Sequence, residues 1–305
     1  MSPDDFALAL RVLDAPVFLD DHGVAGPLGV EFTATTSDGK SVLVTQLSPA
    51  LNSRVTNPDA FVRALERNGY QGAGITESGQ LYLLELPPQG ASLAQRLAAS
   101  GPFPAAELLV VARAAVDVLA RSGPDGEPHG MVTPSTLYTT GAGAVSFRWP
   151  GLLSALRAAG VDGATIGREL GITIFIAPEV QQGALLDARA DVFALGATLY
   201  TALTGRPPFG GRTTATVMAA VLADDAAPST IAADQLTAVL LRAIERDPGD
   251  RWNDIDHLRE ALGASLTPVR ARPALGPAAR RGCRGTALLV VAAGLVLWLV
   301  AQYIS

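Results

Sequence analysis

The sequence predicts an α+β fold followed by one membrane-spanning helix, and three patterns support this prediction. Residues 30–46 alternate apolar and polar side chains around a central turn, which is typical of a β-hairpin. Apolar residues recur at helical spacing over residues 104–121 and again over residues 192–203. Residues 286–304 are largely apolar and carry no charge, and as a helix they would extend roughly 28 Å, close to a bilayer core.

Length and composition allow a large core and exclude several classes of function. The chain has 305 residues, of which 49% are hydrophobic, enough for one two-lobed domain or two small domains. The net charge is −6 and no basic face is evident, so we expect no nucleic-acid partner. The one cysteine, Cys283, excludes an internal disulfide and a cysteine-rich metal site. No apolar leader follows the amino terminus, so we expect no secretory signal.

The first part of the chain carries the strand signals. After the hairpin, Asn57 and Pro58 form a good N-cap and first-turn pair for a helix that Gly69 interrupts. The apolar run of residues 81–86 then predicts a further strand, which two prolines break.

The later part is predicted to be helical. Residues 104–121 indicate one long packed helix. We expect a second helix to begin at Asp191, where a carboxylate can accept hydrogen bonds from orphan backbone N–H groups. This helix should end at Gly205, which two prolines follow closely.

Three landmarks in this helical part resemble those of a known family, in the same order. Ala177-Pro178-Glu179 resembles the A-P-E triplet that closes the activation segment of protein kinases. Residues 191–196 (DVFALG) resemble the start of the buried central helix of these enzymes, and residues 245–252 (ERDPGDRW) resemble a later helical landmark. Over residues 10–265 the chain is similar to bacterial relatives of the eukaryotic Ser/Thr protein kinases.

The resemblance implies a kinase-like two-lobed fold. The β-rich N-lobe would span residues 1–86 and the helical C-lobe residues 87–265, followed by a Pro/Ala/Arg-rich linker over 266–285 and the membrane helix over 286–304. Four residues would keep structural roles only, with the arginine pairing with the A-P-E glutamate: Glu179, Asp191, Arg251 and His129.

The glycine-rich loop is only partly retained. In the family pattern G-x-G-x-x-G-x-V, glycines let backbone amides approach phosphates. Here Val24 stands at the first glycine position, while Gly26 and Gly29 keep the other two. These two glycines, with Glu85 at the start of the interlobe hinge, are weak candidates for nucleotide contact.

The phosphate-binding lysine is replaced. The family's V-A-I-K strand reads Val42-Leu43-Val44-Thr45 here, so a neutral hydroxyl stands in its place. The only lysine of the chain, Lys40, lies in the preceding turn, and no P-loop motif precedes it. The resemblance also places Leu43 above and Tyr138 below the purine slot, and we expect these larger side chains to fill it.

The resemblance implies that the catalytic loop lacks the family's catalytic residues. Residues 129–136 read HGMVTPST where the family has a histidine, a catalytic aspartate and a metal-binding asparagine. The resemblance puts Met131 at the proton-accepting aspartate, Thr133 at the lysine near the γ-phosphate and Thr136 at the asparagine. Trp149 replaces the aspartate of D-F-G, so neither metal-ligand position keeps the residue that binds Mg²⁺ in the family.

Charge around the apolar segment predicts its orientation. Arg280, Arg281 and Arg284 precede it and no basic residue follows. The positive-inside rule therefore places the kinase-like domain in the cytoplasm of a single-pass protein of the cell membrane.

The sequence therefore predicts a membrane-tethered pseudokinase that acts by binding a protein partner, such as an active kinase or a membrane complex, and needs no cofactor. Two alternatives stay open. One is a Ser/Thr protein kinase or nucleotide-binding switch that uses ATP with Mg²⁺ at an unconventional site. The other is a purely structural anchor.

Overall fold

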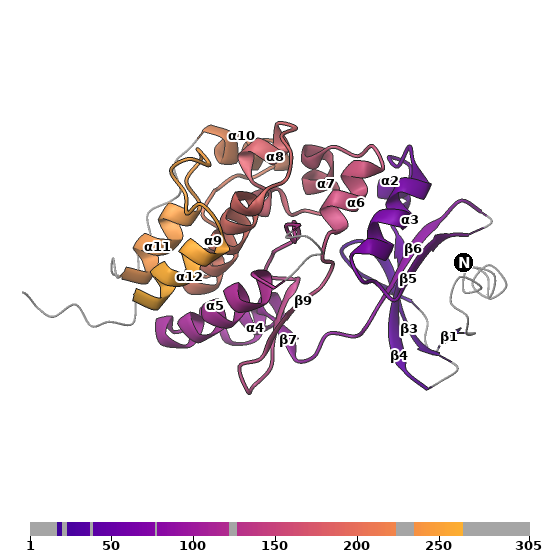
Figure 1. Ribbon diagram of the computed structural model, residues 1–305, viewed down its shortest axis with the longest axis horizontal. Helices are drawn as coiled ribbons and strands as arrows, with labels where there is room; N and C mark the ends of the chain where they lie inside the picture. The colour runs from indigo at the N-terminus through magenta and orange to yellow at the C-terminus, as the bar shows by residue number, and fades with distance from the viewer. Residues whose placement is uncertain are drawn as a thin grey trace, which may run out of the picture. The chain divides into compact units, whose positions relative to one another are not determined.

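An antiparallel sheet forms the N-terminal lobe of the computed structural model (Figure 1). The model describes residues 17–19, 23–36, 39–76, 78–121, 127–223 and 235–264. The strand order is β1-β3-β4-β6-β5, and β2 pairs with β3 off this path. The strands are β1 (Val17–Leu19), β2 (Val24–Ala25), β3 (Gly29–Thr36), β4 (Ser41–Leu47), β5 (Gly72–Ile75) and β6 (Leu81–Glu85).

The predicted hairpin is confirmed as β3 and β4, which pair antiparallel. Strand β6, also predicted, is buried along its whole length. Its side chains alternate between two apolar clusters, because successive residues of a strand point to opposite faces. Leu81 and Leu83 join the main core, whereas Tyr82 and Leu84 pack on the other face of the sheet.

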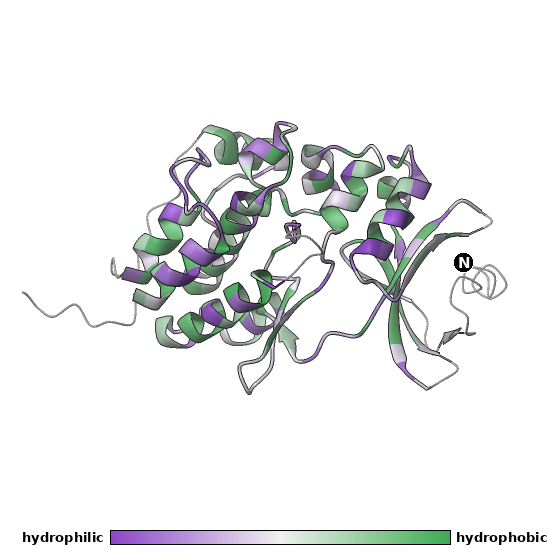
Figure 2. Ribbon diagram, viewed as in Figure 1, coloured by the Kyte–Doolittle hydropathy of each residue, from purple (hydrophilic) through white to green (hydrophobic). Residues whose placement is uncertain are grey.

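Two helices follow β4, namely α2 (Pro49–Asn52) and α3 (Pro58–Arg67). The predicted cap of α3 is confirmed: Asn57 Oδ1 accepts a hydrogen bond from Ala60 N at 3.1 Å, and Pro58 is the first helical residue. Helix α3 mixes hydrophilic and hydrophobic residues (Figure 2), and its Phe61 and Leu65 are buried in the main core.

The C-terminal lobe is mainly helical, with a small sheet in the order β7-β8-β9. These strands are β7 (Ala91–Ser92), β8 (Leu137–Thr139) and β9 (Val145–Phe147). The helices are α4 (Leu93–Ser100), α5 (Ala105–Leu119), α6 (Leu152–Ala158), α7 (Gly163–Glu169), the 3₁₀ turn η3 (Thr173–Phe175), α8 (Pro178–Gln181), α9 (Ala188–Thr204), α10 (Thr214–Ala223), α11 (Gln235–Ala243) and α12 (Ile255–Ala264).

Helix α9 is the centre of this lobe, and one prediction about it was wrong. It begins at Ala188 and not at Asp191, because Asp187 caps it by accepting hydrogen bonds from the N–H groups of Arg189 and Ala190. Thirteen of its residues are buried, so it is enclosed on all sides. The predicted end is confirmed, since Gly205 caps the helix in the left-handed conformation at φ 71°.

The two lobes share one hydrophobic core. Helix α3 packs on α6, and the same buried cluster contains Phe61 from the N-lobe and Leu152 and Leu156 from the C-lobe. The apolar residues of the activation segment belong to this packing too. Ile176 is buried, and Ile172, Ile174 and Phe175 are partly buried against the cluster.

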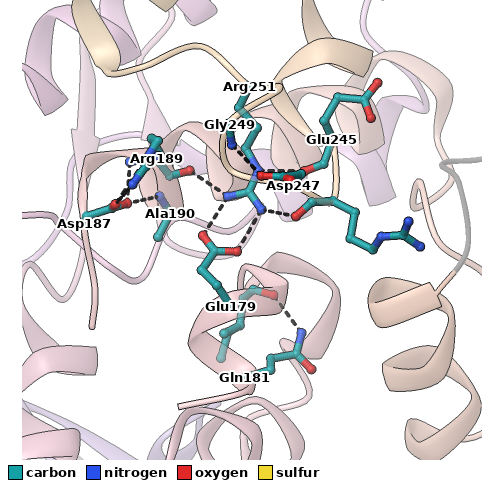
Figure 3. Close-up of polar contacts among 11 residues, drawn as sticks. Glu179, Gln181, Asp187, Arg189, Ala190, Glu245, Asp247, Gly249 and Arg251 are labelled. Carbon is teal, nitrogen blue, oxygen red and sulfur yellow. Dashed lines mark hydrogen bonds and ion pairs between the residues drawn. The ribbon is translucent and has the colours of Figure 1, made fainter. Parts of the chain in front are cut away.

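A buried arginine ties three segments of the C-lobe together (Figure 3). Arg251 is 1% exposed and donates to both carboxylate oxygens of Glu179, at 2.7 and 2.8 Å. Its other donors reach the backbone carbonyls of Glu245 at 2.6 Å, Arg246 at 2.9 Å and Arg189 at 3.2 Å. All five N–H donors of the guanidinium are therefore used.

The predicted linker (266–285) and membrane helix (286–304) lie outside the described residues. Among the helices of the described ranges, none is long and apolar enough to cross a membrane.

Replacing Arg251 with alanine should lower the free energy of unfolding by about 3–5 kcal/mol, because the Glu179 carboxylate and three carbonyls lose their donor. Chemical denaturation measures this loss. The control is Arg259→Ala, which removes exposed ion pairs to Asp117 and Asp256 and should cost less than about 1 kcal/mol. Equal losses in the two variants would contradict the role assigned to Arg251.

Candidate functional site

The candidate site lies where β3, β4 and β6 of the N-lobe face the segment that follows β9. Thr45, at the lysine position, is fully buried on β4, opposite Glu31 on β3 and Leu83 on β6. Its hydroxyl has no hydrogen-bond partner among the described residues. Lys40 does not take this position, since it is exposed between β3 and β4.

The glycine-rich loop is closed on itself. Gly26 N donates to Gly29 O at 2.7 Å, and Gly29 N donates to Gly26 O at 3.2 Å. Between them, Leu28 is fully buried in the main core. Gly29 has φ 152°, and a Cβ there would lie 2.1 Å from Gln46 O, so the strand approach requires glycine. The amides of both glycines are therefore used inside the turn and are not offered to a phosphate.

The loop that carries Met131, Thr133 and Thr136 is also self-contained. Thr136 Oγ1 donates to Met131 O at 2.6 Å and accepts from Thr133 N at 2.8 Å. The two threonine hydroxyls lie 3.1 Å apart, and both residues are at most 2% exposed. The Met131 side chain is buried in the main core. The hydroxyls of Thr133 and Thr136 are therefore used inside the turn.

His129 and Asp191 hold this loop onto α9. Asp191 accepts hydrogen bonds from His129 N at 2.6 Å and Gly130 N at 2.8 Å. His129 Nδ1 accepts from Met131 N at 3.2 Å, so the proton of the neutral ring is on Nε2, which is buried without a partner. Burial lowers the pKa of His129 to about 3 and raises the pKa of Asp191 to about 6. This histidine is a packing residue and not an accessible base.

An ion cluster that the sequence did not predict occupies the cleft. Arg148, 6% exposed, donates through Nε to Glu85 Oε1 at 2.8 Å and through Nη2 to the same oxygen. Its Nη1 donates to both carboxylate oxygens of Glu31 at 3.2 Å. Burial disfavours the charged guanidinium, but Glu85 and Glu31 outweigh it and raise the pKa of Arg148. We call Arg148, Glu31 and Glu85 the arginine clasp.

Trp149 completes the clasp. Its indole Nε1 donates to Glu85 Oε1 at 3.0 Å, and the Arg148 guanidinium lies 4.6 Å from the ring centroid. Trp149 is the one non-glycine residue in the described chain with a positive φ, 65°. This conformation costs of order 1–3 kcal/mol for a bulky residue, so the surrounding contacts must hold it in place.

Two of the three clasp residues stand beside positions that the family pattern marks, but the pattern does not predict that they pair. Glu31 stands two residues after Gly29, where G-x-G-x-x-G-x-V has its valine, and Arg148 directly precedes Trp149. Neither residue is unusual in its own segment. Only the pairing across three elements shows their significance. The predicted filling of the slot by Leu43 and Tyr138 stays a prediction.

Both carboxylates of this site already have a counter-ion. Magnesium prefers carboxylate and phosphate oxygens, and the carboxylates in the cleft, Glu31 and Glu85, are engaged by Arg148. Across the described ranges, no group of three or more His, Cys, Asp or Glu residues could hold a metal ion.

Removing the buried positive charge of Arg148 should destabilise the folded protein. Arg148→Gln leaves two carboxylates close together without their counter-ion, so we expect the free energy of unfolding to fall by about 3–5 kcal/mol. Arg96→Gln is the matched control, because Arg96 pairs bidentately with Glu107 at the surface and should contribute at most about 1 kcal/mol. Urea unfolding compares them, and a loss no larger than that of Arg96→Gln would rule out a structural clasp.

The buried histidine predicts a pH dependence. Since the pKa of His129 is lower in the folded state, the stabilisation it provides is present above about pH 6.5 and is lost as the pH falls toward 3. The advantage of wild type over His129→Gln should therefore shrink by about 1.4 kcal/mol per pH unit between about pH 6 and 4. Asp191 acts oppositely, since its raised pKa removes stability as the pH rises through 6.

Urea unfolding of wild type and His129→Gln at several pH values measures the difference in their free energies of unfolding. Both proteins contain Asp191, so its contribution cancels in that difference. The control is His257→Gln: Asp254 raises the pKa of this exposed histidine, so the wild-type advantage there should grow as the pH falls. A His129→Gln difference that does not change with pH would show that the histidine is not held neutral.

Comparison with known proteins gives this geometry a context. No family model matches the chain. The Ser/Thr protein kinase PknB of Mycobacterium tuberculosis is 28% identical over 252 residues, which cover 80% of this chain and 39% of that protein. A probable Ser/Thr protein kinase of Streptomyces coelicolor is 30% identical over 163 residues, which cover 52% of this chain and 24% of that protein. The chain thus spans less than half the length of these curated relatives.

A solved structure supports the same fold. The crystal structure of Rad53 residues 1–466 with AMP-PNP matches with a TM-score of 0.57 and 16% identity, covering 80% of this chain and 64% of that one. At this identity the likeness concerns the fold alone. The homologues of this chain are bacterial Ser/Thr protein kinases, and its described part has a protein kinase-like fold.

Proposed function

We propose that the chain is a membrane-tethered pseudokinase: a kinase-like domain that regulates signalling by binding a protein partner and transfers no phosphate. The observation that carries this proposal is the arginine clasp. A guanidinium bound to two carboxylates lies in the cleft between the lobes, in contact with the tryptophan that replaces the metal-binding aspartate.

Electrostatics support the absence of phosphoryl transfer. Kinases stabilise the transferred phosphoryl group with a lysine and with metal ions that bridge the phosphates. Here the cleft contains two carboxylates and one guanidinium, a net charge of about −1. A triphosphate would therefore meet like charge, in a site of low dielectric where repulsion is poorly screened. The closed glycine loop and the hydrogen-bonded Thr133–Thr136 turn also disfavour triphosphate binding, because their polar groups are already bonded.

The membrane tether rests on the sequence. Residues 286–304 are long enough to cross a bilayer, and the arginines before them favour a cytoplasmic kinase-like domain. The partner would be a protein held at the same membrane, such as an active kinase or a membrane complex. Crosslinking in native membranes, with a chain ending at residue 285 as the control, identifies it, and the absence of any specific protein would favour a structural anchor.

Nucleotide titration tests the proposal directly. In a thermal-shift assay of the full chain in detergent, ATP with and without Mg²⁺ should leave the melting temperature unchanged, because the cleft offers neither a phosphate cradle nor a metal ligand. An active Ser/Thr kinase measured alongside provides the positive control. A rise in melting temperature with ATP would favour a nucleotide-binding switch, and incorporation of phosphate into any substrate would falsify the pseudokinase assignment.

A further inference from the structure

The outer face of the N-terminal sheet is buried, although no helix among the described residues contributes to the apolar cluster on it. This cluster consists of side chains from β3, β4 and β6 that are at most 4% exposed: Ala34, Val42, Val44, Tyr82 and Leu84. Helix α3 packs on the inner face, where its Phe61 joins the main core together with Leu83. One layer of side chains on a sheet face does not exclude water by itself, so a second layer must lie over the outer face.

Burial on this outer face increases toward one corner. Along β3 the side chains on this face change from Val30, which is 36% exposed, through the partly buried Phe32 to Ala34, which is fully buried. The chain enters the sheet at this corner, since Leu19 of β1 pairs with Ala34. Residues 1–16, which precede β1 and lie outside the described residues, are therefore joined to the sheet beside its most buried part.

The ends of a helix are marked in the sequence of this N-terminal segment. Ser2 and Pro3 are a good N-cap and first-turn pair, as Asn57 and Pro58 are for α3. Pro16 sets the other end, because the residue before a proline disfavours the helical backbone. The sequence therefore predicts a helix over residues 2–13.

The apolar residues of this predicted helix form a stripe. They stand at positions i, i+3, i+4 and i+7: Phe6, Ala9, Leu10 and Leu13. At helical spacing Asp4, Leu8 and Arg11 fall on the opposite side. A helix over residues 2–13 is roughly 18 Å long, whereas three adjacent strands span about 10 Å. The helix is therefore long enough to cross β3, β4 and β6.

We propose that residues 2–13 form an amphipathic helix whose apolar stripe packs on the outer face of the N-terminal sheet. This segment of the chain, and not a second copy or another protein, is the second layer over that face. The clasp residues Glu31 and Glu85 alternate onto the other face of the sheet, so the proposal is independent of the proposed function. A protein partner would then dock on another part of the domain.

Two leucines of the segment provide a matched test, because they differ only in the side of the helix on which they lie. Leu13→Ala removes a side chain of the stripe and should lower the melting temperature of the full chain in detergent by at least about 4 °C, because it leaves a cavity against the sheet. Leu8→Ala, the control, should change the melting temperature by less than about 2 °C. Equal shifts in the two variants would overturn the proposal.

A double-mutant cycle locates the contact on the sheet. Val44 lies on the outer face and Leu83 on the inner face. The melting-temperature shift of Leu13→Ala combined with Val44→Ala should differ from the sum of the single shifts by at least about 2 °C, whereas Leu13→Ala combined with Leu83→Ala should be additive within about 1 °C. Additive shifts with Val44→Ala would place the segment elsewhere and would also overturn the proposal.

Trypsin cleavage measures docking of the segment without depending on global stability. Arg11 is the one trypsin site in residues 1–16. Leu13→Ala should speed cleavage after Arg11 by at least about fivefold over wild type, because cleavage follows the population of the undocked segment. Each rate is divided by that of a peptide of residues 1–16 with the same substitution, and Leu8→Ala should cleave as wild type does.

Two further outcomes would overturn the proposal. One is cleavage of the wild-type chain after Arg11 as fast as that of the free peptide. The other is a melting temperature that rises with protein concentration and is insensitive to Leu13→Ala, because a second copy of the chain would then cover the outer face.

Discussion

A buried guanidinium must keep its charge balanced and its donors bonded, and this requirement organises the cleft. Arg148 is almost completely buried, and leaving it unpaired would cost several kcal/mol. The chain satisfies it with one carboxylate from β3 and one from β6, while the arginine itself follows β9. The clasp therefore links the N-terminal sheet to the C-terminal lobe.

The contacts elsewhere in the molecule show why the fold can contain such a clasp. The contacts that shape the C-lobe do not pass through the cleft. Arg251 binds Glu179 and three backbone carbonyls, and Asp191 holds the loop at residues 129–130. Because none of these contacts uses the side chains of Met131 or Trp149, those side chains can pack or bond internally without disturbing them.

The predictions that succeeded rest on local rules. The Asn57–Pro58 start of α3, the β3–β4 hairpin and the Gly205 end of α9 each depend on a few neighbouring residues. Asp191 shows where such rules stop. A carboxylate near a helix start suits an N-cap, but Asp187 takes that position. Asp191 instead accepts hydrogen bonds from the backbone N–H groups of His129 and Gly130, which are buried and need an acceptor.

By itself, the sequence determined the kinds of element, their order and the residue types at the positions that match the family motifs, because periodicity, caps and motif positions are local properties. The landmark at Glu179 and Arg251 could also be anticipated, since its two residues lie in recognisable motifs. Only the tertiary structure decided which side chains surround those positions. Glu31, Glu85 and Arg148 come from three separate segments and meet only when these segments pack. Charge pairing and burial act between residues that are close in space, and no local pattern records that proximity.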